Sequence, residues 1–135
     1  MNIDGPARRV IYHGWRDHRQ ALLDDGLDPG SRQLLDGSFT TAKIDPGDID
    51  LAVEVPVASG QAPPRPEEPI ARLLLGSRTR MRFNCDAYLI FSLPPDHPDY
   101  RTVTVAAERY WTKWFGRDRR GQPKGRVWAE TRGLG

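Results

Sequence analysis

Two closely spaced aspartates, preceded by a Gly-Ser pair, are the residues of this chain with the clearest chemical potential. Asp48 and Asp50 are separated by one residue, and Ser38 of the pair Gly37-Ser38 lies ten residues ahead of Asp48. Alternate side chains of a β-strand share one face, so a strand over 48–55 would place the two carboxylates side by side. Carboxylate oxygens are ligands that Mg²⁺ prefers. The spacing therefore predicts a site for a hard divalent cation, Mg²⁺ or Mn²⁺.

The apolar residues of the same stretch predict how that site is held. The residues that alternate with the two acids are Ile49, Leu51, Val53 and Val55. On a strand they would point to the opposite face, into a core. A solvent-facing strand edge that carries two acids is the alternative interpretation.

The Gly37-Ser38 pair is a candidate phosphate-binding turn. A residue without a Cβ lets a phosphate approach the backbone closely. Ser38 can supply both a hydroxyl and an N–H to that phosphate. An ordinary turn is the alternative for this pair.

Asp86 offers a third carboxylate, on a strand that we predict over 78–92. The apolar residues Phe83, Cys85, Ala87 and Leu89 alternate there with polar ones, and Asp86 falls on the polar side. Three acids near one triphosphate could hold two metal ions. The alternative is a solvated or salt-bridged carboxylate near Arg82.

Around these residues the periodicity predicts alternating helices and strands. Helices are expected over 7–27, 67–75 and 102–115, and strands over 32–35, 48–55, 78–92 and 126–131. Gly76 is expected to cap the second helix at its C-terminal end. Residues 56–66 form a proline-rich loop, and the tryptophans of the last helix, Trp111 and Trp114, are expected in the core rather than on a base-stacking surface.

The bulk composition is that of one globular domain spanning residues 1–135. The net charge is +2, but residues 101–135 carry a net +6 and residues 1–100 a net −4. The basic C-terminal part, 117–135, could bind a phosphate or an RNA backbone, or be a solvated loop. Cys85 is the one cysteine, and no apolar run is long enough to span a bilayer. Residues 1–6 lack a basic segment followed by an apolar run, so no signal peptide is expected. A cytoplasmic location without membrane contact is the expectation.

A resemblance becomes specific when these pieces are read together. Gly37-Ser38, the Asp48-Ile49-Asp50 run and the later Asp86 resemble the signature of the DNA polymerase β-like nucleotidyltransferase superfamily, in its minimal single-domain bacterial members. The run from Asp36 to Leu51 also resembles an uncharacterised bacterial and phage family with this fold, as do the segments 110–116 and 123–125.

The resemblance implies an α/β (α+β) fold with a mixed central sheet flanked by helices. It also implies that Asp48 and Asp50 are metal ligands, that Asp86 is the third carboxylate and the base for the incoming hydroxyl, and that Gly37 and Ser38 seat the terminal phosphates. Phe39-Thr40-Thr41 replaces the arginine-rich run of many minimal members. Other cations must therefore contact the triphosphate, and the candidates are Lys43, Arg80, Arg82 and Lys124.

The expected function is transfer of a nucleoside monophosphate from a nucleoside triphosphate, for which ATP is expected, to a hydroxyl of a protein or an RNA. Such single-domain proteins resemble members of toxin–antitoxin or phage-defence pairs, so a protein partner or an RNA acceptor is expected; oligomerisation is left open. The alternatives are an inactive nucleotidyltransferase-like binding module, such as an antitoxin or anti-defence protein, and a small RNA-binding protein. Adjacent carboxylates repel each other, and a pure binding module has no need of them.

Overall fold

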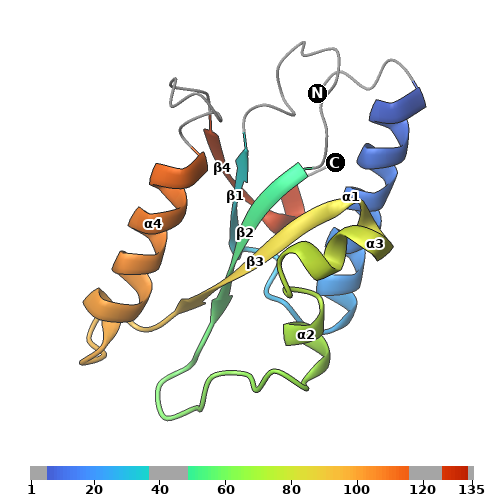
Figure 1. The fold of residues 1–135 in the computed structure, drawn as a ribbon. Helices are drawn as coiled ribbons and strands as arrows, with labels where there is room; N and C mark the ends of the chain where they lie inside the picture. Colours follow the sequence, from blue (N-terminus) through green and yellow to red (C-terminus); the bar gives the residue numbers. More distant parts are fainter. Residues whose placement is uncertain (1–5, 37–48, 116–125, 134–135) are drawn as a thin grey trace.

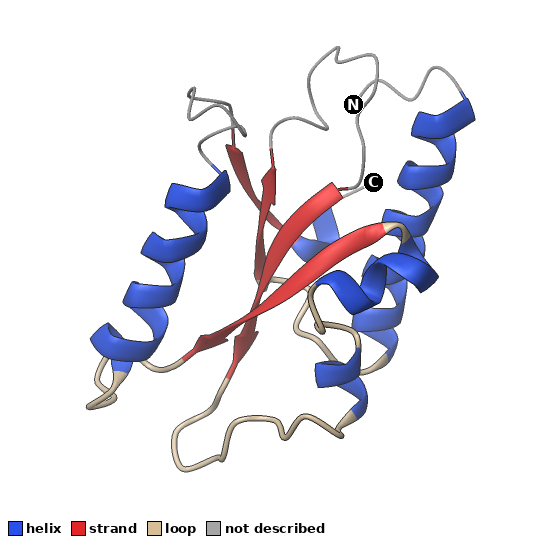
Figure 2. Cartoon of the chain, in the orientation of Figure 1, coloured by secondary structure: helices blue, strands red, loops and turns tan. Residues whose placement is uncertain are grey.

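The computed structural model describes residues 6–36, 49–115 and 126–133. Within these ranges lie four strands, β1 (Arg32–Asp36), β2 (Ile49–Pro56), β3 (Cys85–Ser92) and β4 (Arg126–Glu130), and four α-helices, α1 (Pro6–Asp24), α2 (Pro69–Arg72), α3 (Arg80–Phe83) and α4 (Ala106–Phe115). Three further helical segments are η1 (Ser77–Thr79), the π-helical turn η2 (Tyr100–Val105) and η3 (Thr131–Gly133). Both helices and strands are thus distributed along the described parts of the chain, in the order α1-β1-β2-α2-η1-α3-β3-η2-α4-β4-η3 (Figure 2).

The strands form one mixed sheet in the order β3-β2-β1-β4. β1 pairs antiparallel with both β2 and β4, whereas β2 and β3 are parallel. Parallel neighbours need a long crossover connection, and the segment that contains α2, η1 and α3 supplies it. The predicted fold class, an α+β domain with a mixed central sheet, is confirmed.

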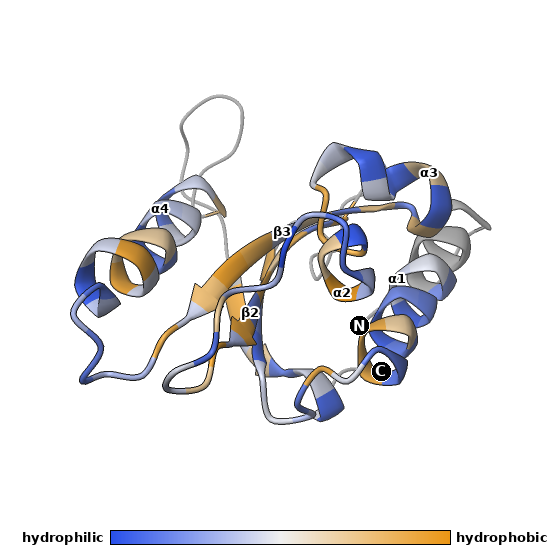
Figure 3. Ribbon diagram, turned by 90° about the horizontal axis from the view of Figure 1, so that it is seen from below, coloured by the Kyte–Doolittle hydropathy of each residue, from blue (hydrophilic) through white to orange (hydrophobic). Residues whose placement is uncertain are grey.

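The sheet lies between two layers of helices. Helices α1, α2 and α3 cover one face and α4 covers the other, as Figures 1 and 3 both show. The strands β2 and β3 are the most hydrophobic part of the chain in Figure 3, consistent with burial on both faces. Each side chain of the sheet therefore points either toward α1, α2 and α3 or toward α4.

The face covered by α1, α2 and α3 carries the larger core. The alternate β2 residues Ile49, Leu51, Val53 and Val55 are buried there, with Trp15 and Leu22 of α1 and Cys85 and Ala87 of β3. The expectation that the four apolar residues of this strand point into a core is confirmed. So is the expected alternation of Cys85 and Ala87 with polar neighbours.

The α4 face holds a second, smaller core. Leu34, Ala52, Ile90 and Phe115 are buried in it, and Trp111 packs against them. Trp114 is 62% exposed, so the expectation that both tryptophans lie in the core is wrong for Trp114. On a helix, Phe115 lies four residues from Trp111 and takes the inward position, which turns Trp114 toward solvent.

The largest differences between predicted and observed boundaries lie between residues 67 and 92, and the first helix also ends earlier than predicted, at Asp24 instead of residue 27. The segment before Cys85 forms the helix α3 and is not extended. Asn84 caps this helix, and its left-handed backbone (φ 56°) turns the chain into β3. The hydroxyl of Thr79 donates to the carbonyl oxygens of Gly76 (2.7 Å) and Cys85 (2.8 Å), which holds this turn against the strand. The helix expected over 67–75 is the short α2, capped by Leu73, and Gly76 instead precedes η1.

Among the described residues, none of the helices is both long and apolar enough to cross a membrane.

His18 links α1 to the segment after α2 and predicts a pH dependence of stability. Its Nε2 lies 2.6 Å from the carbonyl oxygen of Leu73, and its buried Nδ1 has no hydrogen-bond partner among the described residues. Burial lowers the pKa of His18 below its ordinary value of 6.5, with the Leu73 bond opposing and Arg82 adding to this shift. The folded state therefore prefers neutral His18, and its stability contribution is complete above pH 6.5 and declines as the pH falls below it.

Urea unfolding of the native chain and of the His18→Gln variant between pH 5 and 8 tests this expectation. The native chain should lose stability below pH 6.5 more steeply than the variant, which cannot titrate at this position. Equal slopes in the two proteins would show that His18 is not the group responsible.

Candidate functional site

The structure places two of the three predicted acids side by side. Asp50 of β2 is the direct register partner of Asp86 of β3. Neighbouring strands lie about 4.8 Å apart, and paired residues of parallel strands point to the same face. That face is the one covered by α4, since the next residues along it, Ala52 and Tyr88, belong to the α4 core. Asp86 is buried and Asp50 is half-buried.

Asp86 forms an ion pair with Arg80 of α3. Nε of Arg80 donates to Oδ1 of Asp86 at 2.9 Å, and its Nη2 donates to Oδ2. β3 is an edge strand, so a side chain from outside the sheet can reach this carboxylate. The expected alternative for Asp86, a salt-bridged carboxylate, is thus met in part, with Arg80 as the partner and not Arg82, whose guanidinium lies over the ring of Phe83.

Tyr88 lies next to the acid pair on the same face. Burial raises the pKa of the Tyr88 phenol, and the nearby charges of Asp86 and Asp50 raise it further, whereas Arg80 lowers it. Both carboxylates therefore act on one phenol. The Tyr88 ring stacks on Trp111 of α4, with ring centroids 4.3 Å apart. The site is in this way connected to α4 through a pair of aromatic rings.

Gly76 allows a second segment to close over this ring. Its N–H donates to the carbonyl oxygen of Ala87 at 2.7 Å, and its φ is +67°. A Cβ at this position would lie 2.9 Å from Cε1 of Tyr88, so only glycine fits without a shift of the ring. The Gly76-Ser77 turn therefore packs on the edge of β3 beside the acid pair.

The other predicted site residues lie outside the described residues. They are the metal ligand Asp48 and the nucleotide-binding candidates Gly37, Ser38, Lys43 and Lys124. In the sequence, Gly37 directly follows β1 and Asp48 directly precedes β2. Because β1 and β2 are antiparallel and β2 and β3 are parallel, the last residues of β1 and the first residues of β2 and β3 lie at the same end of the sheet. The described part of the site, Asp50 and Asp86, lies at that end of the strands.

The donor set of the described site suits a hard cation. Two carboxylates meet the usual protein share of a Mg²⁺ site, in which waters and substrate phosphates complete the coordination. Among the described residues no group of three or more His, Cys, Asp or Glu side chains could hold a metal ion. Asp50 and Asp86 are therefore a two-ligand set, and they fit Mg²⁺ or Mn²⁺ by the chemistry of their oxygens.

A charged cluster ties α4 to the same face of the sheet. Nη2 of Arg32 donates to Glu54 of β2 at 2.5 Å and to Glu108 of α4 at 2.6 Å. The Arg32 guanidinium also lies 4.4 Å from the ring centroid of Trp128. None of these three charges was predicted as part of a cluster, because the partners are between 22 and 76 residues apart in the chain.

The surroundings of Glu54 in this cluster predict a second pH dependence of the free energy of unfolding. Burial raises the pKa of Glu54 above its ordinary value of 4.5; Glu108 raises it further and Arg32 lowers it. The folded state therefore disfavours ionised Glu54, and this penalty grows as the pH rises from 4.5 through the raised pKa. The free energy of unfolding of Glu54→Gln should thus increase relative to that of the native chain between pH 4.5 and 8. Chemical unfolding of both proteins measures this difference, and a difference that is constant with pH would contradict the assignment.

The fold and the site define an α+β protein whose mixed sheet carries an acid pair near the starts of β2 and β3. The family of unknown function DUF6932 matches residues 2–130, so the chain belongs to this family. No curated protein and no solved structure matches the chain.

Proposed function

We propose that this protein is a Mg²⁺-dependent nucleotidyltransferase that moves a nucleoside monophosphate from a nucleoside triphosphate to a hydroxyl of a protein or an RNA. The observation that carries the proposal is the register of β2 and β3, which makes Asp50 and Asp86 direct neighbours. The chemistry needs acids from separate strands at one point. Arg80 offsets part of the repulsion between these two like charges, and a bound cation would offset more of it.

The proposed roles are those that the resemblance to nucleotidyltransferases implies. Asp48 and Asp50 would hold Mg²⁺ (or Mn²⁺), with Asp86 as the third ligand. When bound, the metal supplies positive charge that stabilises the transferred phosphoryl group and the leaving pyrophosphate. Asp86 would take the proton of the acceptor hydroxyl, while Gly37, Ser38, Lys43 and Lys124 would bind the phosphates of the nucleotide, for which ATP is the proposed source.

Arg80 is the described cation best placed to assist. It already lies against Asp86 through two hydrogen bonds, and half of its side chain is exposed. A guanidinium binds carboxylate and phosphate oxygens with the same fork geometry. Arg80 can thus bind Asp86 without a ligand and contact a phosphate when the nucleotide is bound. A partner protein of a toxin–antitoxin or phage-defence pair is the proposed biological setting.

The same ion pair favours a second candidate function, an inactive nucleotidyltransferase-like binding module. Both carboxylate oxygens of Asp86 accept hydrogen bonds from Arg80, so a protein that never binds metal would also keep this ion pair. The two candidates differ in what the acids do. In the module they contribute only to structure, and in the enzyme they contribute to nucleotide binding and transfer.

Calorimetric titration with ATP, with and without Mg²⁺, separates the two candidates. The enzyme should bind ATP more tightly with Mg²⁺, and incubation with α-labelled ATP and cell lysate should label a protein or an RNA. Protease and ribonuclease treatment of the labelled product then identifies the acceptor class. Absence of both Mg²⁺-dependent binding and labelling would overturn the enzyme and leave the binding module.

A further inference from the structure

The side of α4 and η2 that faces away from the sheet combines cations with exposed aromatic rings. We call this surface the α4 outer face. It consists of Tyr100, Arg101, Arg109, Tyr110, Lys113 and Trp114.

The charge of the α4 outer face is positive throughout. Between residues 100 and 115 the sequence contains one acid, Glu108. Glu108 is bonded to Arg32 of β1 and is therefore directed toward the sheet. The cations Arg101, Arg109 and Lys113 are exposed, and none of them forms an ion pair with another described residue. This face is thus suited to a polyanion.

The aromatic rings of the face form a continuous series that leads to the acid pair. Tyr110 and Trp114 are 53% and 62% exposed, and their ring centroids are 6.2 Å apart. Tyr110 also meets the ring of Trp111 edge-to-face at 4.8 Å, and Trp111 stacks on Tyr88. Tyr88 is the neighbour of Asp86 on the same face of β3. Large exposed rings of this kind are costly in water unless they bind something, and nucleic acid bases stack on them.

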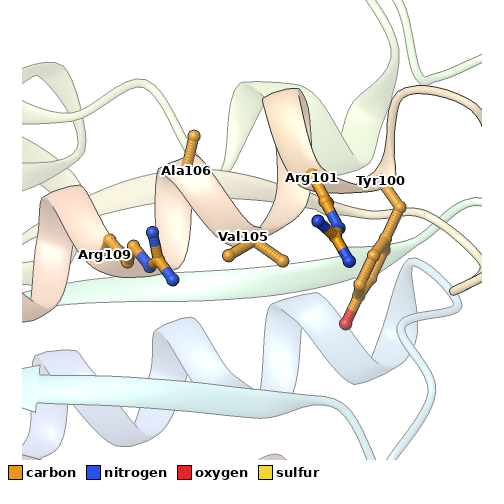
Figure 4. A pocket seen from close by; sticks show the side chains of 5 residues that line it. All are labelled: Tyr100, Arg101, Val105, Ala106 and Arg109. Atoms are coloured by element: carbon orange, nitrogen blue, oxygen red, sulfur yellow. The ribbon is translucent and has the colours of Figure 1, made fainter.

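A pocket lies at η2 and the N-terminal end of α4. It encloses about 700 Å³ and is lined by Tyr100, Arg101, Val105, Ala106 and Arg109. Figure 4 shows that the side chains of Arg101, Val105 and Arg109 project from one side of the helix and that the Tyr100 hydroxyl lies near Arg101. The π-helical turn η2 forms this end, and such turns occur frequently at functional sites. Two guanidiniums and a phenol suit a phosphate and an adjacent ribose hydroxyl.

From these observations we infer that the α4 outer face binds single-stranded RNA. Arg101, Arg109 and Lys113 contact its phosphates, and bases stack on Tyr110 and Trp114. RNA is favoured over DNA because the Tyr100 phenol can donate to and accept from the ribose 2′-hydroxyl, which DNA lacks. RNA binding is independent of the proposed transfer reaction. The further role of this RNA as the acceptor of the nucleotidyl group rests on the proposed function.

Fluorescence anisotropy with a labelled oligouridylate of about 12 nucleotides tests the inference. The Tyr110→Ala, Trp114→Ala variant should bind at least about 30-fold more weakly, because it removes two stacking rings and the loss of each lowers the affinity at least about 5-fold. Trp114→Phe, which keeps a ring, should recover part of the affinity. Met81→Ala is the matched control, since Met81 is 96% exposed on α3 and lies outside this face.

The charge contribution is tested by salt dependence. Removing two phosphate contacts in Arg101→Ala, Arg109→Ala should lower the slope of log affinity against log salt by about 1.4, at ~0.7 for each phosphate of a single strand. The variant Arg16→Ala, Arg72→Ala loses the same charge from exposed residues of α1 and α2, on the other side of the sheet, and should keep the native slope. Equal slopes for the two double variants would overturn the assignment of this face.

The identity of the strand is tested by three comparisons. Oligouridylate should bind more tightly than the deoxy-oligomer of the same length, and Tyr100→Phe should abolish that preference; equal affinity for both in the native chain would overturn the choice of RNA. Displacement of the RNA by polyglutamate as effectively as by unlabelled RNA would indicate an acidic protein as the partner and overturn the proposal. Asp50→Asn should keep native RNA affinity, so failure of RNA binding and failure of transfer can be told apart.

Discussion

Replacing Asp50 by asparagine is expected to lower Mg²⁺-dependent nucleotidyl transfer by at least about 100-fold while leaving the protein folded. A bound metal contributes several kcal/mol of transition-state stabilisation, and each 1.36 kcal/mol is a factor of ten in rate. Asparagine has nearly the same shape as aspartate but lacks its charge. Asp50 is half-buried beside Asp86 on the neighbouring strand, and asparagine keeps its shape there, so the thermal midpoint should stay close to the native value.

Labelled-nucleotide transfer and thermal unfolding of the same preparation measure these two effects. Asp17→Asn is the matched control, since Asp17 is an exposed acid on α1, on the far side of the sheet. It should keep full transfer activity. Native activity in Asp50→Asn would exclude the acid pair from catalysis, and a large fall in the thermal midpoint would instead assign Asp50 a structural role.

The second large effect is expected from Gly14→Ala, which should destabilise the fold by about 1–3 kcal/mol. A Cβ at Gly14 would lie 2.1 Å from the carbonyl oxygen of Phe83 and 2.7 Å from its carbonyl carbon. These are backbone atoms of α3, so relief requires α1 and α3 to move apart, and such overpacking costs 1–3 kcal/mol and occasionally more. α3 carries Arg80, the partner of Asp86, so the site should be perturbed as well.

The sign of this effect discriminates between two explanations of the glycine. If only helix propensity mattered, alanine would stabilise α1 by about 1 kcal/mol. Urea unfolding decides between a gain and a loss. Gly133→Ala is the control, because a Cβ there meets no atom within 4 Å, and its effect should stay within about 0.5 kcal/mol. A Gly14→Ala protein as stable as the native chain would disprove the close approach.

The effect of helix α4 on the site could not be predicted from local sequence. A strand over 48–55 was predicted with one buried face, and that face is confirmed. The opposite face is also covered, with Ala52 and Glu54 buried and Arg32 joining β1, β2 and α4. Alanine and glutamate give no apolar alternation, so burial on the second side depended on where α4 packs.

The sequence by itself determined the types of the main elements, the buried face of β2 and the candidate acids. These depend on periodicity between near neighbours, which the chain carries locally. Only the tertiary structure decided that Asp50 faces Asp86, that Arg80 binds Asp86, that α1 needs Gly14 and that Trp114 is exposed. These facts depend on strand register and helix packing between distant segments. Such contacts form only when the whole chain buries its core, so no short stretch of sequence specifies them.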